Sequence, residues 1–310
     1  MVSALLVEGN STVSGRIKAA GAKNAALPIL SAALLLDGVV SLSRVPDLCD
    51  VTNLIELLGY LGVRFLMKDD MTLQIDATKI TEFNVPNELV NKMRASFLVL
   101  GPLLARVGRA KVPFPGGCAI GVRPLDLHIF GLQKLGAKIV MHDDCVEATA
   151  PAGGLRGGVV DFDFPSVTAT ENIIMAAVLA KGVTTINGAA REPEVVDLVN
   201  FLNKVGADIQ GAGSNKIIIK GVEKLNSDQG YSIMGDRVEV GTFLIAATMT
   251  GGDIEITGID PQVLESPLQH LRLAGAEISC GVDSIKLNML DKKLRAVSIT
   301  TAPYPGFPTD

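Results

Sequence analysis

The sequence contains no tryptophan, and tryptophan, tyrosine and phenylalanine together make up only 4% of its 310 residues. Any large core must therefore be built from aliphatic side chains, which the hydrophobic content of 48% can supply. This composition excludes a disordered, collagen-like or disulfide-scaffold protein. At roughly 100–200 residues per domain, the length predicts two domains.

Cysteine and histidine are also scarce. The four cysteines lie far apart with no CxxC pair, and the three histidines are equally scattered. This pattern indicates neither a structural zinc site nor a disulfide framework, and it favours a reducing cytoplasm. The residues concerned are Cys49, Cys118, Cys145, Cys280, His128, His142 and His270.

Charge and hydropathy exclude two further classes of partner. The 28 Lys and Arg residues are outnumbered by 33 Asp and Glu residues, so no overall basic field can hold nucleic acid. The longest apolar run, residues 25–36, is interrupted by Pro28 and Ser31 and is too short to cross a membrane. The amino-terminal residues lack the basic segment of a secretory signal. We expect a cytoplasmic protein that has no nucleic-acid or membrane partner.

Internal repetition is the strongest architectural signal. The phrases LGYLGVRF, LQKLGAKI, LNKVGADI and LRLAGAEI are variants of one another. Leucines at positions 54, 57, 58 and 61 have the spacing of one buried helix face. Each phrase therefore predicts a helix end, capped by a left-handed glycine and followed by a strand. The capping glycines, 74, 70 and 69 residues apart, are Gly62, Gly136, Gly206 and Gly275.

A second helix, rich in small apolar residues, precedes each phrase, and a glycine turn with a short strand joins the two helices. Each repeat therefore reads strand–helix–strand–helix–strand–strand. Residues 296–310 are similar to residues 159–170, the strand and turn that open the third repeat. We therefore expect a strand and a turn there too, with Asp310 at a helix N-cap and the chain a fragment of a longer protein.

Several predicted helix starts carry a cation. Lys23 and Asn24 open GAKNAALPIL, with Pro28 expected in about the first turn, and Arg94 and Arg237 hold similar places in the second and fourth repeats. Backbone N–H groups at a helix start, beside a cation, form an anion site. The alternative for each residue alone is an ordinary helix start with a solvated side chain. Their recurrence favours helix amino ends that converge on an anionic ligand.

The segment PFPGGCAIGVRPLDLH has the composition of a glycine-rich loop with Cys118 at its middle. Arg123, five residues further on, would stabilise a thiolate and lower the pKa of the thiol. A free cysteine is more often a small buried hydrophobic residue. Composition alone leaves a reactive and an inert thiol equally open, and we expect the three histidines to be structural.

These segments, with MRASFLVLGPLLAR, AAREPEVVDLVNFLNKVGA and TAPYPGFPTD, resemble the UDP-N-acetylglucosamine 1-carboxyvinyltransferases, enolpyruvyl transferases of peptidoglycan synthesis. The resemblance runs from about residue 5 to residue 310. It implies an α/β fold, an inside-out α/β barrel of six βαβαββ units in two domains, with ligands bound between the domains and no metal or organic cofactor. Residues 23–233 would form a complete three-unit domain. Residues 1–22 and 234–310 would form a discontinuous, incomplete catalytic domain, since six such units need about 420 residues.

The resemblance implies that the enolpyruvyl group of phosphoenolpyruvate is transferred to the 3′-hydroxyl of UDP-N-acetylglucosamine, with release of phosphate. Cys118 would protonate C3 of phosphoenolpyruvate and would be the residue that fosfomycin alkylates, and Asp310 would orient or deprotonate the sugar hydroxyl. Closure of the Cys118 loop over the sugar nucleotide would exclude water. Phosphoenolpyruvate would bind to Lys23, Asn24 and Arg123. The UDP-sugar would bind to Arg94, Arg123, Pro124, Leu125, Asp126, Leu127, Phe164, Pro165, Ser166 and Val167.

Two departures from this family pattern bear on function. Thr168 stands where the family commonly has glycine after Ser-Val, a change that bears on contacts near the nucleotide. The missing length leaves open a non-catalytic fragment that at most binds the UDP-sugar. A third alternative, the related transferase that acts on shikimate 3-phosphate, is disfavoured because that enzyme lacks the Cys118 loop.

Overall fold

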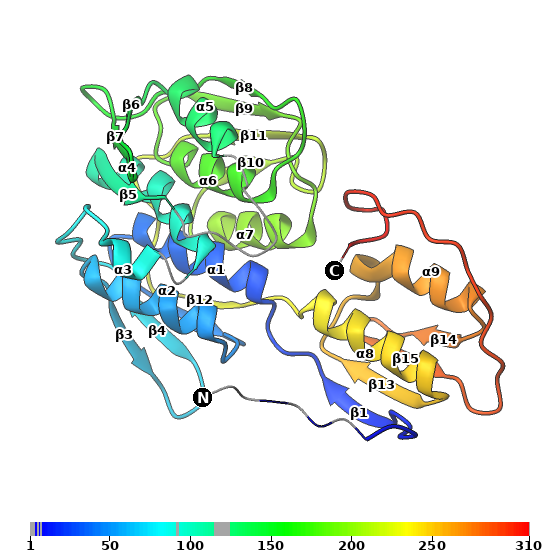
Figure 1. Ribbon diagram of the computed structural model, residues 1–310. Coiled ribbons are helices and arrows are strands. Elements are labelled where there is room, and N and C mark those ends of the chain that lie inside the picture. Colours follow the sequence, from blue (N-terminus) through cyan, green and yellow to red (C-terminus); the bar gives the residue numbers. More distant parts are fainter. Residues whose placement is uncertain (1–3, 5, 7, 91–92, 115–124, 310) are drawn as a thin grey trace. The chain divides into compact units, whose positions relative to one another are not determined.

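The computed structural model describes residues 4, 6, 8–90, 93–114 and 125–309, and the structural statements below concern these residues. The chain forms two compact units, a larger one of residues 21–233 and a smaller one of residues 1–20 and 234–310. It therefore starts in the smaller unit, builds the larger unit and then returns, as the colours in Figure 1 show.

The larger unit alternates short strands and helices. In chain order its elements are α1 (Lys23–Ala32), η1 (Ala33–Leu35), β2 (Val39–Ser43), α2 (Cys49–Tyr60), β3 (Arg64–Met67), β4 (Leu73–Asp76), α3 (Asn87–Val90), η2 (Arg94–Val99), α4 (Leu100–Val107), β5 (Arg109–Pro113), α5 (Asp126–Lys134), β6 (Lys138–Met141), β7 (Cys145–Thr149), β8 (Val159–Asp161), α6 (Val167–Ala177), β9 (Val183–Asn187), α7 (Pro193–Lys204), β10 (Asp208–Gln210), β11 (Lys216–Lys220) and β12 (Gln229–Ser232).

The smaller unit has the same alternation on a smaller scale. Its elements are β1 (Gly15–Lys18), α8 (Arg237–Thr250), β13 (Asp253–Thr257), η3 (Pro261–Leu264), α9 (Glu265–Leu273), β14 (Glu277–Cys280) and β15 (Ser284–Asn288). Its core is formed by aliphatic side chains of α8, α9 and the sheet, among them Val240, Leu244, Ile254, Leu268 and Ile285.

The sheets repeat one pattern of pairing, which confirms the predicted repeat. The strand orders are β12-β2-β4-β3, β5-β7-β6, β10-β11-β9-β8 and β1-β13-β15-β14. In each sheet the last strand of the repeat lies between its two predecessors and is antiparallel to both. The four-stranded sheets add an outer parallel strand. In the second repeat Asn84 takes this place, because it forms a parallel bridge with Lys111 on β5.

Two of these outer strands are exchanged between repeats. β1 precedes the first repeat in sequence but pairs in parallel with β13 of the fourth, from Gly15 opposite Ile254 to Lys18 opposite Thr257. β12 precedes the fourth repeat but pairs in parallel with β2 of the first. The sheet that opens the larger unit is therefore completed by the last strand of that unit.

Four helices end in the same hydrogen-bonded cap. The glycine that follows each helix has a positive φ, between 89° and 107°. The N–H of the next residue donates to a carbonyl five residues back, which is the long hydrogen bond of the Schellman motif. The predicted glycine caps are thus confirmed. The carbonyls belong to Leu58, Leu132, Leu202 and Leu271.

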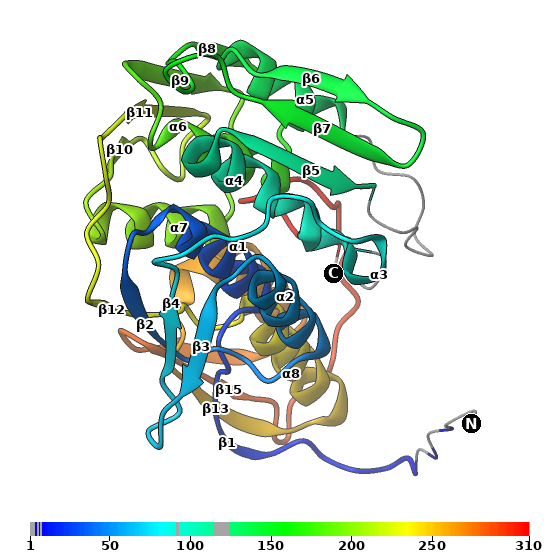
Figure 2. The same cartoon turned by 90° about the vertical axis from the view of Figure 1, so that its left-hand side faces the viewer.

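Helices lie inside the larger unit and sheets outside it (Figure 1 and Figure 2). Residues 25–32 of α1 and 169–177 of α6 are all buried, which is typical of a helix in the centre of a domain. The outer strands alternate, and β11 shows the strict exposed–buried order of a sheet with one solvated face. The predicted inside-out α/β architecture is confirmed.

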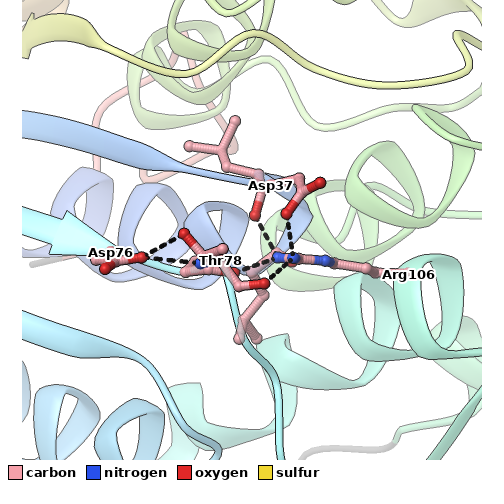
Figure 3. A network of polar contacts seen from close by, with 7 residues as sticks. Asp37, Asp76, Thr78 and Arg106 are labelled. Atoms are coloured by element: carbon pink, nitrogen blue, oxygen red, sulfur yellow. Dashed lines mark hydrogen bonds and ion pairs between the residues drawn. The ribbon is translucent and has the colours of Figure 1, made fainter.

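Arg106 on α4 ties this unit together across two repeats (Figure 3). Its side chain is only 17% exposed, and Asp37 lies 3.5 Å from the guanidinium. Four backbone carbonyls accept its N–H groups, so the chain ends of η1 and β4 are held at α4. The acceptors are the carbonyl oxygens of Leu34 (2.9 Å), Leu36, Ala77 (2.7 Å) and Thr78 (3.2 Å).

Three local predictions need correction. Pro28 lies in the second turn of α1 rather than about the first, because the helix begins at Lys23. Arg94 opens a 3₁₀ helix, and α-helical geometry begins only at Leu100. Residues 296–300 form no strand, because no described strand pairs with them, and a bridge between residues 301 and 307 closes a turn instead.

Within the described part of the chain, no helix is both long enough and apolar enough to span a bilayer.

Candidate active site

The described residues that the resemblance assigns to the two substrates lie at the amino ends of helices of the larger unit. Lys23 and Asn24 are the first two residues of α1, and Arg94 is the first residue of η2. Residues 125–127 contain the N-cap and first two residues of α5, and residues 164–167 lead into α6. Cys118, Arg123, Pro124 and Asp310 lie outside the described residues.

The helices that these residues open pack against one another, and the starts of α5 and α6 are joined by the contact between His128 and Thr168. The 3₁₀ helix η2, which begins at Arg94, contacts α1, α2 and α6. Helix α5 also packs along α6. The site segments at the starts of α1, η2, α5 and α6 therefore belong to one packed group of helices, which the sequence repeat alone does not reveal.

Lys23 is oriented by a carboxylate from the neighbouring helix. Its Nζ lies 3.1 Å from Oδ2 of Asp50, in the first turn of α2, and both side chains are more than a third exposed. The N-cap residue Ala22 has no side-chain acceptor, so α1 presents the positive end of its dipole beside the ammonium group. Asn24, also exposed, follows on the same turn. This arrangement suits an anionic ligand.

The loop before α6 exposes an aromatic ring and ends in a capping serine. Phe164 is 54% exposed, and Pro165 beside it is exposed as well. Oγ of Ser166 accepts a hydrogen bond from the N–H of Ala169 at 3.4 Å, which fixes the start of the helix. The segment can therefore offer an apolar ring and a helix amino end to one ligand.

A buried histidine connects α5 with α6. Nε2 of His128 lies 3.2 Å from Oγ1 of Thr168, and Nδ1 lies 3.0 Å from Nδ2 of Asn172. The ring is 4% exposed and packs edge-on against Phe97 of η2. Burial lowers the pKa of His128 to about 4, so the ring is neutral at neutral pH. This confirms the structural role expected for this histidine.

Glu171, one turn after Thr168 on α6, has a buried carboxyl group. Glu171 is 2% exposed, and its Oε1 has no hydrogen-bond partner among the described residues. Burial, followed by the charges of Glu194 and Glu192, raises the pKa of Glu171 well above its ordinary value. Glu171 is therefore a candidate for a neutral carboxylic acid near the amino ends of these helices.

The smaller unit contributes a separate pocket. Arg237 is the first residue of α8, whose N-cap Asp236 accepts hydrogen bonds from the N–H groups of Val238 (2.8 Å) and Glu239 (3.1 Å). Arg237 also lies over the ring of Tyr304 at 5.5 Å. Among the residues that line the pocket are Arg237, Thr242, Ile245, Leu264, Phe307 and Pro308. Two of them come from the segment that leads to Asp310.

The partners of these residues carry little signal in the sequence. No sequence motif points to Asp50, Asn172 or Glu171, and Thr168 stands out only as a departure from the pattern of the sugar-nucleotide transferases. Asp50 carries one usable signal, since an acidic residue in a first turn commonly stabilises a helix start. The contacts of Asn172 and Glu171 depend on packing between helices, for which the sequence holds no local signal.

Comparison with known proteins identifies the family. Residues 7–310 match the family model described as EPSP synthase (3-phosphoshikimate 1-carboxyvinyltransferase). Among solved structures, the enolpyruvyl transferase NikO from Streptomyces tendae aligns with a TM-score of 0.83 and 24% identity, over 97% of this chain and 71% of that one. EPSP synthase from Acinetobacter baumannii aligns with a TM-score of 0.72 and 19% identity, over 95% of this chain and 68% of that one. The chain therefore belongs to the EPSP synthase family of enolpyruvyl transferases.

Proposed function

We propose that this protein transfers the enolpyruvyl group of phosphoenolpyruvate to the 3′-hydroxyl of UDP-N-acetylglucosamine and releases phosphate. The family supports the enolpyruvyl transfer. The observation that carries the choice of acceptor is the sequence PGGCAIGVRPLDLH around Cys118, which resembles the sugar-nucleotide enzymes and is absent from the enzyme that acts on shikimate 3-phosphate.

The reaction requires an acid, a base and cations. The sugar hydroxyl oxygen bonds to C2 of phosphoenolpyruvate, its proton passes to Asp310, and Cys118 delivers a proton to C3. The resulting tetrahedral adduct loses a proton from C3 and expels phosphate, which restores the carbon–carbon double bond. The products are the enolpyruvyl ether of the sugar nucleotide and inorganic phosphate.

Lys23 and Asn24 suit the phosphoenolpyruvate end of this reaction. The ammonium group of Lys23 is held 3.1 Å from Asp50 and is partly exposed at the amino end of α1. The ammonium charge and the helix dipole together would stabilise the charge of a carboxylate or phosphate group. Arg123 would add a second cation in the same role.

The two segments proposed for the sugar nucleotide start adjacent helices. Residues 125–127 and 164–167 open α5 and α6, which pack together and are joined by the His128–Thr168 hydrogen bond. Arg94 opens η2, which contacts α6. The three segments thus start helices of one packed group, which supports the proposal that one extended ligand, a nucleotide with an attached sugar, contacts all of them.

The second candidate acceptor is shikimate 3-phosphate. It is favoured by the description of the matching family model and by the structural likeness to an EPSP synthase. The two acceptors differ in a simple way, since only UDP-N-acetylglucosamine has a uridine diphosphate to bind.

Phosphate release from phosphoenolpyruvate by the purified 310-residue chain tests the proposal. It is measured without acceptor, with UDP-N-acetylglucosamine and with shikimate 3-phosphate. We expect release only with UDP-N-acetylglucosamine, and a block by fosfomycin. Release with shikimate 3-phosphate alone would replace the proposed acceptor. No release from a chain that circular dichroism shows to be folded would favour a non-catalytic protein, and isothermal titration with UDP-N-acetylglucosamine then measures whether binding survives.

A further inference from the structure

The hydroxyl of Thr168 closes a chain of hydrogen bonds between two segments at the candidate site. Thr168 is the second residue of α6, directly after residues 164–167. Its Oγ1 lies 3.2 Å from Nε2 of His128, which follows directly after residues 125–127 on α5. Thr168 is exposed whereas His128 is buried. The contact therefore joins an exposed residue at the start of α6 to a buried residue of α5.

The direction of each hydrogen bond in this chain follows from its neighbours. Oδ1 of Asn172 accepts the backbone N–H of Gly101 at 2.7 Å. The amide nitrogen Nδ2 of Asn172 then donates both its hydrogens, one to the carbonyl of Phe97 at 3.1 Å and one to Nδ1 of His128 at 3.0 Å. Because Nδ1 accepts, the single proton of the neutral ring is on Nε2, and Oγ1 of Thr168 accepts it.

The side chain at position 168 therefore determines whether the buried Nε2–H of His128 has a hydrogen-bond acceptor. Nε2–H of His128 has one acceptor among the described residues, the Thr168 hydroxyl. A serine at position 168 supplies the same hydroxyl oxygen, whereas a valine has the shape of threonine without that oxygen. Glycine, which the sugar-nucleotide transferases commonly have at this position, has no side chain at all. Loss of the Thr168 hydroxyl would leave the Nε2–H of His128 without a hydrogen-bond acceptor inside the protein. The imidazole ring between α5 and α6 would then no longer be held in place.

We propose that Thr168 is a positioning residue for the sugar nucleotide, holding residues 164–167 in register with residues 125–127 through His128. This inference rests on the proposed function, in which both segments contact the UDP-sugar. Thr168 acts through His128 and needs no contact with the reacting atoms. It should therefore influence the binding of the sugar nucleotide and leave the chemical step and phosphoenolpyruvate binding almost unchanged.

The matched variants Thr168→Val and Thr168→Ser test this role. For Thr168→Val we expect KM for UDP-N-acetylglucosamine to rise about tenfold, equivalent to about 1.4 kcal/mol of binding. Its kcat and its KM for phosphoenolpyruvate should change less than twofold, and Thr168→Ser should stay within twofold of the wild type throughout. An unchanged KM in Thr168→Val, or an equal rise in Thr168→Ser, would overturn the proposal.

A spectroscopic measurement separates this inference from the proposed function. In ¹⁵N-labelled protein the Nε2–H proton of His128 should give an observable resonance, because it is buried and hydrogen-bonded. We expect the resonance in the wild type and in Thr168→Ser and its loss in Thr168→Val. A wild type that turns over UDP-N-acetylglucosamine without this resonance overturns the role of Thr168 alone. A wild type with the resonance but no activity on UDP-N-acetylglucosamine overturns the proposed function, and the substrate-positioning role with it, although the hydrogen bond stands.

Discussion

The backbone N–H of Gly101 donates to Oδ1 of Asn172 at 2.7 Å, at a place where α4 and α6 are too close for any side chain on residue 101. A Cβ atom at this position would lie 2.3 Å from Oδ1 and 2.4 Å from the backbone oxygen of Asn172. Glycine is therefore required at a contact between two interior helices.

We expect Gly101→Ala to lower the free energy of unfolding by about 3 kcal/mol, because the helices must separate and the hydrogen bond to Asn172 weakens. Urea unfolding measures this as a lower midpoint with an unchanged m-value. Gly59→Ala is the matched control, since Gly59 lies within α2 and a Cβ there meets nothing within 4 Å. The control should be neutral or stabilising by up to about 1 kcal/mol, and a similar loss in both variants would contradict the explanation.

Arg106 offers a second test of how the repeats are joined. Arg106→Lys keeps the charge but cannot satisfy four carbonyls in two segments, so we expect a loss of about 2–3 kcal/mol in the free energy of unfolding. Asp37→Asn should change it by less than about 0.5 kcal/mol, because the Asp37 side chain is 74% exposed. Equal losses in the two variants would show that the ion pair, rather than the carbonyl contacts, is the important interaction.

His128 should make stability fall in mildly acidic solution. Its pKa is about 4 in the folded chain, against 6.5 for an unperturbed histidine, so between these values the unfolded chain binds a proton that the folded chain does not. Stability from this group is complete above about pH 6.5 and is lost as the pH falls to 4, by about 3 kcal/mol in total. We propose His128→Gln as the comparison, with urea unfolding measured from pH 4 to pH 8. The difference between the two proteins should vary with pH only in this window, and a constant difference would refute the assignment.

Glu171 should have the opposite dependence on pH. Its pKa is raised in the folded protein, so the stability associated with the protonated form is present below the ordinary pKa of 4.5 and is lost as the pH rises. Glu171→Gln removes the ionisation but keeps the shape, and we expect it to stabilise the protein at pH 8 and to have little effect at pH 4. The exposed Glu223→Gln is the control and should stay within about 0.5 kcal/mol at both values. A destabilised Glu171→Gln at pH 8 would mean that the carboxylate has a partner.

Fosfomycin labelling tests the role of Cys118. Intact-mass spectrometry should find one adduct in the wild type and none in Cys118→Ser, whose turnover should fall by at least about 100-fold. Cys118→Asp should also escape labelling while retaining turnover, since a carboxylic acid can protonate C3. Cys145→Ser should label normally, because Cys145 is 3% exposed and burial, with the nearby carboxylate of Asp144, raises the pKa of its thiol.

Cys49 and Cys280 are exposed, so they are the controls for unspecific alkylation. Cys280→Ser should be labelled and active like the wild type. If Cys118→Ser is labelled as strongly as Cys280→Ser, the role given to Cys118 is wrong.

Helix starts and helix caps, which depend on a few neighbouring residues, could be predicted from the sequence. The caps at Gly62, Gly136, Gly206 and Gly275 were predictable because a helix end depends on a few consecutive residues and on the one residue type that tolerates a positive φ. The same holds for the helix starts at Lys23 and Arg237. The prediction of a strand at residues 296–300 is wrong. A strand must also pair with the edge of a sheet, and the local sequence does not say whether such an edge lies beside it.

The candidate site likewise combines features that depend on neighbouring residues with contacts that depend on the packing of distant ones. The repeats, their capped helices and the residue types at the helix starts are predictable from the sequence, because each is a property of neighbouring residues. Three relationships become visible only in the folded chain: β1 and β12 each pair in the sheet of another repeat, Asp50 orients Lys23, and His128 joins Thr168 to Asn172. These contacts join residues 27 to more than 200 positions apart, and they form only when whole helices and sheets pack to bury their apolar faces.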